Sequence, residues 1–163
     1  MSQIEGYREL YEYERDCNRK MLAMIESVPA VNRDDASFMQ AVLLADHLAA
    51  CRENWLEYMR GDGTSLVPWF KETGDLASLK PRYAALETQW ADYLATLDDA
   101  QLALDFTFPG EDGRRYAVRT EVQIVQLVGH ASYHRGQIAL LVDQLSGETV
   151  DTDYVDWVVS RSA

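Results

Sequence analysis

The chain has 163 residues, 47% of them hydrophobic and 26% charged, which indicates one soluble globular domain over residues 1–163 and excludes a disordered or low-complexity protein. Twenty-seven acidic residues against fifteen Lys and Arg give a formal net charge of -12, which argues against nucleic acid and anionic membranes as partners. No segment approaches the ~18 uninterrupted apolar residues of a membrane span, and no basic start followed by an apolar run indicates a secretion signal, so we expect a cytoplasmic protein.

The first part of the chain predicts two long helices. Apolar residues recur at helical spacing from Gln3 to Ser27, and Pro29 then closes this segment. A second helix is expected to begin near Asp35 or Ser37, because both are good N-cap residues, and to end at Gly61. The inner face of this second helix contains a histidine near its middle.

The next part predicts two more long helices with a hairpin between them. Residues 61–75 are rich in turn formers, and helical spacing returns over residues 76–97, with Pro81 in or near the first turns. Residues 101–119 contain two short alternating segments separated by PGEDG, which predicts a β-hairpin. The helix that follows is expected to start with a capping box formed by Thr120 and Gln123 and to end at Gly147.

The tail, DTDYVDWVV, predicts a short helix with Asp151 or Thr152 as its N-cap, packed on the rest through Tyr154 and Trp157. The chain contains no internal repeat and no obvious linker. Four long helices joined by connections of uneven length predict a mainly α protein, a four-helix bundle with a short β-hairpin inserted before the fourth helix. In such bundles, metal and cofactor sites are built from inward-facing side chains.

The three histidines of the chain all fall on apolar helical faces. His130 and His134 are four residues apart, so they lie one turn above each other on the same side of a helix and can reach one ion together. His47 lies on a different helix. A single buried histidine is more often a hydrogen-bonded core residue than a ligand, but three on inward faces favour a site for one divalent metal ion. Three imidazoles leave coordination positions open, as catalytic sites do.

Two other metal-site patterns fit the sequence less well. A metalloprotease helix reads HExxH, with the glutamate as general base, but Ala131 follows His130 here. A di-iron bundle needs paired Glu-x-x-His segments, and Leu127 and Ala131 occupy the positions three residues before the two histidines. The sequence therefore predicts neither a zinc protease nor a two-metal carboxylate site.

Three segments resemble the DinB/YfiT-like family of metal-dependent proteins. These are GHASYHRGQIALL in the last long helix, the histidine of LLADHLAACRENWLEYMRG in the second, and the closing DTDYVDW. The likeness covers nearly the whole chain, and its most specific part is the HxxxHRGQ segment. The resemblance implies an up-up-down-down four-helix bundle, usually a homodimer, and one zinc, nickel or iron ion per chain. His47, His130 and His134 match the three metal-ligand positions of the family.

Neighbours of the histidines have alternative roles that the sequence leaves open. Arg135 can pair with a carboxylate at the bundle surface, Gly136 can allow a neighbouring helix to approach, and Gln137 can form a hydrogen bond near the site. Cys51 can face the metal, although a reduced thiol in the core is the expected state of both Cys51 and Cys17.

Asn54 and Tyr58 continue the face of His47 and can line a pocket, as can Tyr11 on the first helix, although aromatic residues at helical spacing more often pack in the core. Other aromatic side chains are compatible with a buried homodimer face, namely Tyr7, Tyr11, Tyr13, Trp69 and Trp90.

Two functions remain open from the sequence. The first is a metal-dependent enzyme, a transferase or hydrolase, acting on a small molecule; relatives in the wider superfamily include transferases of low-molecular-weight thiols such as bacillithiol or mycothiol, so the resemblance implies thiol transfer in stress response or detoxification. The second is a non-catalytic protein whose ion is structural or sensory. No general base stands out beside the histidines, which weakens a hydrolase, and no catalytic residue is assigned.

Overall fold

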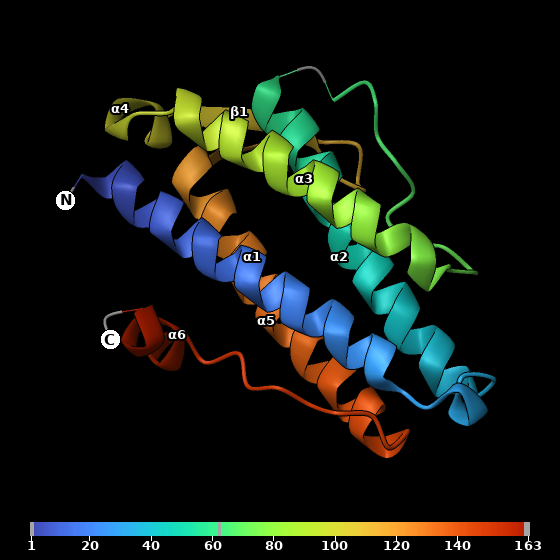
Figure 1. Ribbon diagram of the computed structural model, residues 1–163. Coiled ribbons are helices and arrows are strands. Elements are labelled where there is room, and N and C mark those ends of the chain that lie inside the picture. The colour runs from blue at the N-terminus through green and yellow to red at the C-terminus, as the bar shows by residue number, and fades with distance from the viewer. Residues whose placement is uncertain (1, 62, 162–163) are drawn as a thin grey trace.

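The computed structural model describes residues 2–61 and 63–161, so residues 1, 62, 162 and 163 of the predicted domain lie outside the described part. The chain is mainly helical with one small hairpin, as predicted (Figure 1). Its elements are α1 (Gln3–Ser27), the short 3₁₀ helix η1 (Ala30–Asn32), α2 (Ala36–Arg60), α3 (Leu76–Thr96), α4 (Asp99–Leu102), β1 (Asp105–Pro109), β2 (Arg115–Arg119), α5 (Thr120–Gln144) and α6 (Tyr154–Arg161).

The ends of α2 are set by local chemistry that the sequence contains. The Asp35 carboxylate accepts a hydrogen bond from the backbone N–H of Ser37 at 2.8 Å, as an N-cap does. Gly61 ends the helix with a φ of 101°, a left-handed conformation that glycine adopts without steric cost. Both predicted ends of this helix, which contains His47, are therefore confirmed.

α1 and α5 run parallel to each other. At their N-terminal ends the Gln3 amide donates a hydrogen bond to the Glu121 carboxylate at 2.5 Å. At their C-terminal ends the backbone N–H of Glu148 donates to the Ser27 hydroxyl at 2.7 Å. In Figure 1 these two helices lie side by side, α1 in blue and α5 in orange.

α2 and α3 run parallel to each other and antiparallel to α1 and α5. Arg82 early in α3 bonds Asp46 at 2.7 Å, and Arg60 at the end of α2 donates to the backbone carbonyl of Gln89 at 3.3 Å. α1 and α3 are antiparallel, because Arg8 near the start of α1 donates to the carbonyl of Leu94 near the end of α3. The directions in chain order are up, down, down, up, so the up-up-down-down order implied by the resemblance is wrong.

The lengths of the connections explain these directions. A helix of 25 residues such as α1 is about 38 Å long, and residues 28–35, even fully extended, reach less than about 30 Å. They can only join α1 to a helix that starts at the same end. Residues 61–75 reach about 50 Å and can return along α2, so that α3 starts at the end where α2 started. Asn54 pins this connection to α2 through two hydrogen bonds with the Val67 backbone, at 2.8 and 2.9 Å.

The hairpin and the tail helix are present as predicted, but the helix after the hairpin and the tail helix do not have their predicted N-caps. β1 pairs antiparallel with β2, and β2 leads directly into α5. Thr120 does not cap this helix, because its hydroxyl bonds the Leu104 carbonyl at 3.3 Å and Arg119 occupies the N-cap position. In the tail, Asp153 caps α6 by accepting from the Val155 N–H at 2.7 Å. Trp157 packs the tail helix against α1 beside Tyr13, at a ring separation of 5.7 Å.

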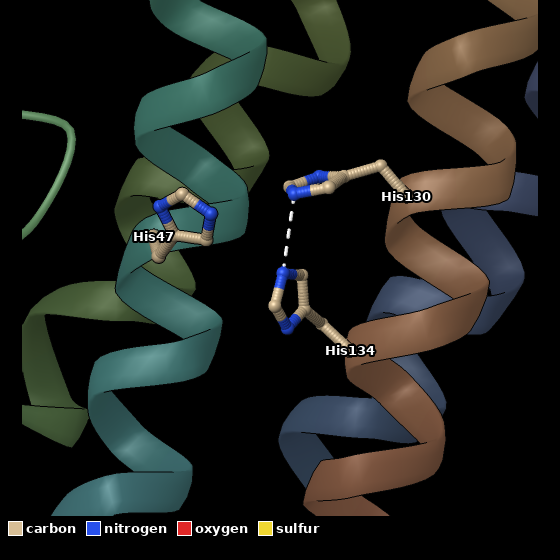
Figure 2. A group of neighbouring side chains, drawn as sticks. All are labelled: His47, His130 and His134. Atoms are coloured by element: carbon tan, nitrogen blue, oxygen red, sulfur yellow. Dashed lines mark hydrogen bonds between the residues drawn. The ribbon is translucent and has the colours of Figure 1, made fainter.

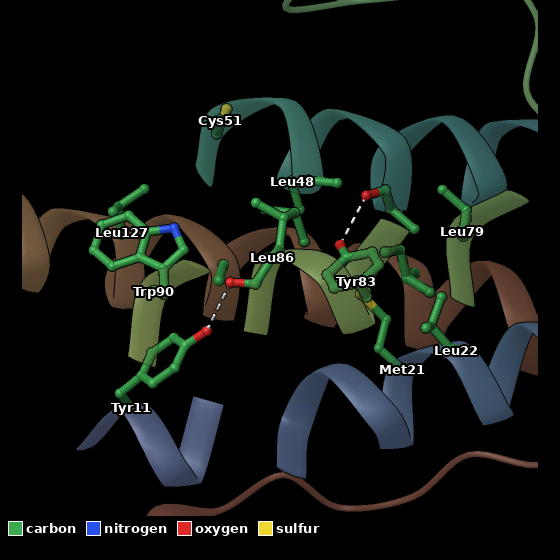
Figure 3. Packing of buried hydrophobic residues seen from close by; sticks show 14 of the residues in the cluster. Tyr11, Met21, Leu22, Leu48, Cys51, Leu79, Tyr83, Leu86, Trp90 and Leu127 are labelled. Atoms are coloured by element: carbon green, nitrogen blue, oxygen red, sulfur yellow. Dashed lines mark hydrogen bonds between the residues drawn. The ribbon is translucent and has the colours of Figure 1, made fainter. Parts of the chain in front are cut away.

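The core between the long helices is apolar and includes several buried aromatic rings (Figure 3). Tyr83 donates its hydroxyl to the Ala45 carbonyl at 2.8 Å, and Trp90 donates its indole N–H to the Arg52 carbonyl at 3.2 Å. Tyr11, Tyr13 and Trp90 are buried within the chain, so these three do not form an exposed dimer face. Their polar groups have internal partners, which allows aromatic side chains to occupy a core.

Candidate metal centre

His47 projects from the middle of α2 and is held in one orientation. Its Nδ1 lies 2.7 Å from the backbone carbonyl oxygen of Trp69, so Nδ1–H donates and Nε2 presents its lone pair. The ring of Phe70 stacks on the imidazole at a centroid separation of 4.2 Å and an interplanar angle of 9°. Burial lowers the pKa of His47, which favours the neutral form that binds metal.

His130 and His134 project from consecutive turns of α5 toward His47 (Figure 2). Their Nε2 atoms are 3.1 Å apart. The Nδ1 of His134 is 2.6 Å from the Gln137 side-chain oxygen, so this N–H donates to Gln137 and Nε2 faces the centre of the group. Burial, followed by the charges of the two neighbouring histidines, lowers the pKa of His130 to about 4, so this imidazole is neutral at physiological pH.

The three imidazoles converge as the sequence predicted. Their ligand nitrogens all lie within 4.8 Å of one another, and the His47 ring centroid is 5.2 Å from each of the other two. Two nitrogens bound to one ion at ~2.0–2.1 Å are about 2.9 Å apart in octahedral cis geometry and about 3.3 Å apart in tetrahedral geometry. The observed 3.1 Å between His130 and His134 lies between these values. The donor set therefore fits one divalent ion.

Among the described residues, no carboxylate or thiolate joins this group of three nitrogens. A closed structural zinc site has four protein ligands, whereas a catalytic site commonly has three and keeps a position for water or substrate. The group of three histidines offers three protein nitrogens, the number that catalytic sites commonly have.

Cys51 contacts His47 without pointing into the group. Its sulfur is 3.6 Å from Nε2 and 3.8 Å from Nδ1 of His47, so it lies over the ring rather than in line with one nitrogen lone pair. Burial raises the pKa of the Cys51 thiol to about 12, which keeps it protonated. Both cysteines are buried and free, as predicted. Of the neighbours that the sequence left open, Gln137 contacts the histidines, while Asn54 holds the connection between α2 and α3.

Arg135, next to His134, belongs to a buried ion cluster and not to the bundle surface. Its guanidinium makes two hydrogen bonds to the Glu14 carboxylate of α1, at 2.9 and 3.1 Å, and Arg52 of α2 bonds the same carboxylate. All three side chains are almost fully buried. This cluster, Glu14–Arg52–Arg135, ties α1, α2 and α5 together beside the histidines. Gly136 does not serve close approach within the chain, because an added Cβ there meets no described atom within 4 Å.

Three residues that shape this region were not among those that the sequence predicted for the site, namely Glu14, Trp69 and Phe70. Glu14 carried a usable signal, since it lies at helical spacing between Tyr11 and Cys17 on the apolar face of α1. A carboxylate at such a position predicts a buried cationic partner. Trp69 and Phe70 carried no comparable signal, because they lie in a connection without periodicity.

The DinB family model matches residues 1–160. The chain belongs to the DinB family. Searches of curated proteins and of solved structures found no significant match. None of the helices within residues 2–61 and 63–161 has the length and apolar character needed to cross a bilayer. Family membership and the three-histidine group together support a DinB protein that can hold a metal ion.

Proposed function

We propose that this DinB protein binds one zinc, nickel or iron ion per chain through His47, His130 and His134, and that it is a metal-dependent enzyme acting on a small molecule. The observation that carries the proposal is the convergence of three imidazole nitrogens from two helices within 4.8 Å. Two hydrogen bonds support it, because the Trp69 carbonyl and the Gln137 side-chain oxygen accept from Nδ1 of His47 and His134 and so direct Nε2 of these rings toward the centre.

A divalent ion at this position supplies Lewis acidity, which lowers the pKa of a coordinated thiol or water toward neutrality. The chain's own residues provide neutral ligands and a partly buried surrounding. His47 is buried and its pKa is lowered, and burial also lowers the pKa of His130. The lowered pKa values of His47 and His130 favour the neutral imidazoles that bind a cation.

Transfer to a low-molecular-weight thiol, such as bacillithiol or mycothiol, is the specific reaction that we propose, with a role in stress response or detoxification. The thiol sulfur forms a bond to an electrophilic carbon, the leaving group departs with the electron pair of its broken bond, and the thiol proton goes to water. This reaction suits a group of three histidines that no described carboxylate joins, because it does not require a protein general base as hydrolysis does.

The alternative is a non-catalytic protein in which the ion mainly links α2 to α5. The buried ion cluster argues against this role, because Arg52 on α2 and Arg135 on α5 both bond Glu14 without any metal. The metal-free protein is therefore expected to be folded. A chain that unfolds on metal removal would support the structural alternative.

We also propose a cytoplasmic homodimer that binds no nucleic acid or membrane. The formal net charge of -12 supports the exclusion of anionic partners. Exposed apolar side chains on α5 give one helix face that a second copy can cover, namely Val122, Val125, Tyr133 and Leu140. Analytical ultracentrifugation tests the dimer, and a single species of 18.5 kDa at micromolar concentration would contradict it.

Elemental analysis of protein without a histidine tag tests the metal centre. About one metal ion per chain is expected in the parent, and none in His47→Ala, His130→Ala or His134→Ala. Cys51→Ser is the control, because its sulfur touches His47 but does not join the group, and it should retain the ion. A parent without metal after reconstitution, or three variants that keep it, would refute the proposal.

The transferase is tested with metal-loaded protein, bacillithiol or mycothiol, and monochlorobimane as the electrophile. The sulfur displaces chloride, and the fluorescent product measures the rate. Product formation above the uncatalysed rate in the parent, and not in His47→Ala, supports the transferase. No acceleration with either thiol would count against thiol transfer while leaving the metal centre in place.

A further inference from the structure

A pocket with aromatic walls lies next to His47, because two of its lining residues contact this histidine. Its volume is about 410 Å³, within the usual range for sites that bind small organic molecules. The side chains that form its walls come from three separate parts of the chain, and we call them the aromatic pocket: Trp55, Tyr58, Trp69, Phe70 and Phe108, with residues 109–111 at the rim. Tyr58 is among the residues that the sequence pattern suggested for a pocket.

Three elements assemble this pocket. α2 contributes Trp55 and Tyr58, about two and three turns after His47. The connection between α2 and α3 contributes Trp69 and Phe70. The hairpin contributes Phe108 from β1, whose ring lies edge-on to Trp55 at a centroid separation of 4.8 Å. Trp69 also contacts Trp55 edge-on, at a centroid separation of 5.9 Å. The rings hold one another by edge-to-face contacts, so the walls exist without a ligand.

Two residues that line the pocket also contact His47 of the candidate metal centre. Phe70 lines the pocket and also stacks on His47 at 4.2 Å. Trp69 lines the pocket and its carbonyl orients His47 at 2.7 Å. A molecule seated in the pocket therefore contacts two residues that in turn contact a proposed metal ligand.

The exposure of Phe70 indicates that something covers this surface. Its side chain is 74% exposed, although its neighbours Trp55 and Trp69 are half-buried. A single exposed apolar residue needs no explanation, but here the exposed ring forms part of a concave aromatic surface beside a potential reaction centre. A flat ring stacked in the pocket would remove this apolar area from water.

Charge narrows the class of ligand. Glu111 is the one ionisable carboxylate among the described pocket residues, and no Lys or Arg lines the pocket. The whole chain carries a formal net charge of -12. A phosphorylated or otherwise polyanionic ligand would be repelled by the negative charge of the protein, and no cationic side chain among the described pocket residues could bind it.

We propose that the small molecule on which this protein acts has an uncharged aromatic body, which the aromatic pocket binds, and a donor or reactive group directed toward the histidines. This inference rests on the proposed function for its metal centre, and it names the electrophile of the thiol reaction as an aromatic compound. Binding of the ring itself requires only the pocket and no metal.

The first test uses metal-free protein and 4-fluorobenzyl alcohol, followed by ¹⁹F NMR. The parent should broaden or shift the fluorine signal in a saturable way. Phe70→Ala and Phe108→Leu should weaken binding about three- to tenfold, because each removes one aromatic contact. Val31→Ala is the control, since Val31 is 84% exposed and lies outside the pocket, and it should bind as the parent does. No saturable binding to the folded parent would overturn the inference.

The second test uses zinc-loaded protein with two inhibitors that share a metal-binding head. Benzohydroxamate carries an aromatic ring and acetohydroxamate a methyl group. The parent should bind benzohydroxamate at least tenfold more tightly, and Phe70→Ala should reduce this ratio while Val31→Ala preserves it. Equal, zinc-dependent binding of both compounds would overturn the aromatic pocket and leave the metal centre intact. Ring binding in the first test without zinc-dependent binding of either compound here would overturn the placement of the reactive group toward the histidines and leave the aromatic pocket.

Discussion

Two polar clusters lie beside each other on α2 and α5, the first of them joined by Glu14 of α1, and they differ in the partners of their polar groups. In the cluster Glu14–Arg52–Arg135, one carboxylate receives hydrogen bonds from both guanidinium groups in the core. In the cluster of three histidines, the rings direct nitrogens toward a common centre, and no described carboxylate joins them. The first cluster pairs its opposite charges within the protein, whereas the second could hold a metal ion.

From this difference we expect the first cluster to control the stability of the fold and the second to control metal binding, although both contain residues of α2 and α5. Residues 134 and 135 are neighbours in sequence, yet His134 contacts Gln137 and Arg135 contacts Glu14. Removing a charge from the first cluster should change folding, and removing a nitrogen from the second should change metal binding. A variant of either cluster that changed both folding and metal binding would contradict this separation.

The largest expected effect is that of Glu14→Gln. This change keeps the size of the side chain but leaves two buried guanidinium groups without their carboxylate, which lowers the free energy of unfolding by about 3–5 kcal/mol. Urea denaturation of the metal-free protein measures it. Glu12→Gln on the same helix is the control, because the ion pair of Glu12 with Arg15 is exposed and contributes about 0.2–1 kcal/mol. A loss below about 1 kcal/mol for Glu14→Gln would contradict the role of this cluster.

The next effect concerns Gln137→Ala. Loss of the oxygen that accepts from His134 Nδ1 frees the ring to rotate and should weaken metal binding about 10- to 100-fold. Competition with a chromogenic chelator gives the affinity. Gln126→Ala, an exposed glutamine on the same helix, should change nothing. Equal affinities in Gln137→Ala and the parent would show that the Gln137 hydrogen bond does not orient His134 for metal binding.

A smaller effect follows from pH. The pKa of His130 falls from 6.5 in the unfolded chain to about 4 in the folded protein, so between these values the unfolded chain binds more protons at this residue. The free energy of unfolding of metal-free protein should therefore decrease as pH falls from about 6.5 toward 4. Denaturation curves across this range measure the slope, and His130→Gln should reduce it. An unchanged slope in the variant would assign the pH dependence to other groups.

The smallest expected effect is that of Gly136→Ala, which tests α5 apart from both clusters. A helical glycine with open space at its Cβ position weakens the helix, so alanine should raise the free energy of unfolding by about 0.5–1 kcal/mol. Metal stoichiometry should not change. A destabilisation that depends on protein concentration would instead place Gly136 in a contact between two copies.

Periodicity and end signals predicted most of the fold because they act within a few residues. Asp35 and Gly61 set the ends of α2 through their own backbone conformation and nearest neighbours. The same logic failed at Thr120, where the approach of Leu104 from the hairpin provides a competing partner for the hydroxyl. Local chemistry predicts a cap only where no tertiary contact competes with it.

The sequence by itself determined the helical class, the hairpin and the three candidate ligands. Helical spacing places His130 and His134 on one side of α5, and the absence of other histidines leaves His47 as the third. These inferences depend on distances along the chain of one or two helical turns.

Only the tertiary structure decided the direction of α3, the ion cluster around Glu14 and the aromatic pocket beside His47. Each joins residues far apart in sequence, such as Glu14 with Arg135, or His47 with Phe70 from an aperiodic connection. A helical repeat defines which face a side chain occupies but not which other face it meets. That choice follows from connection lengths and from the packing of all the helices together.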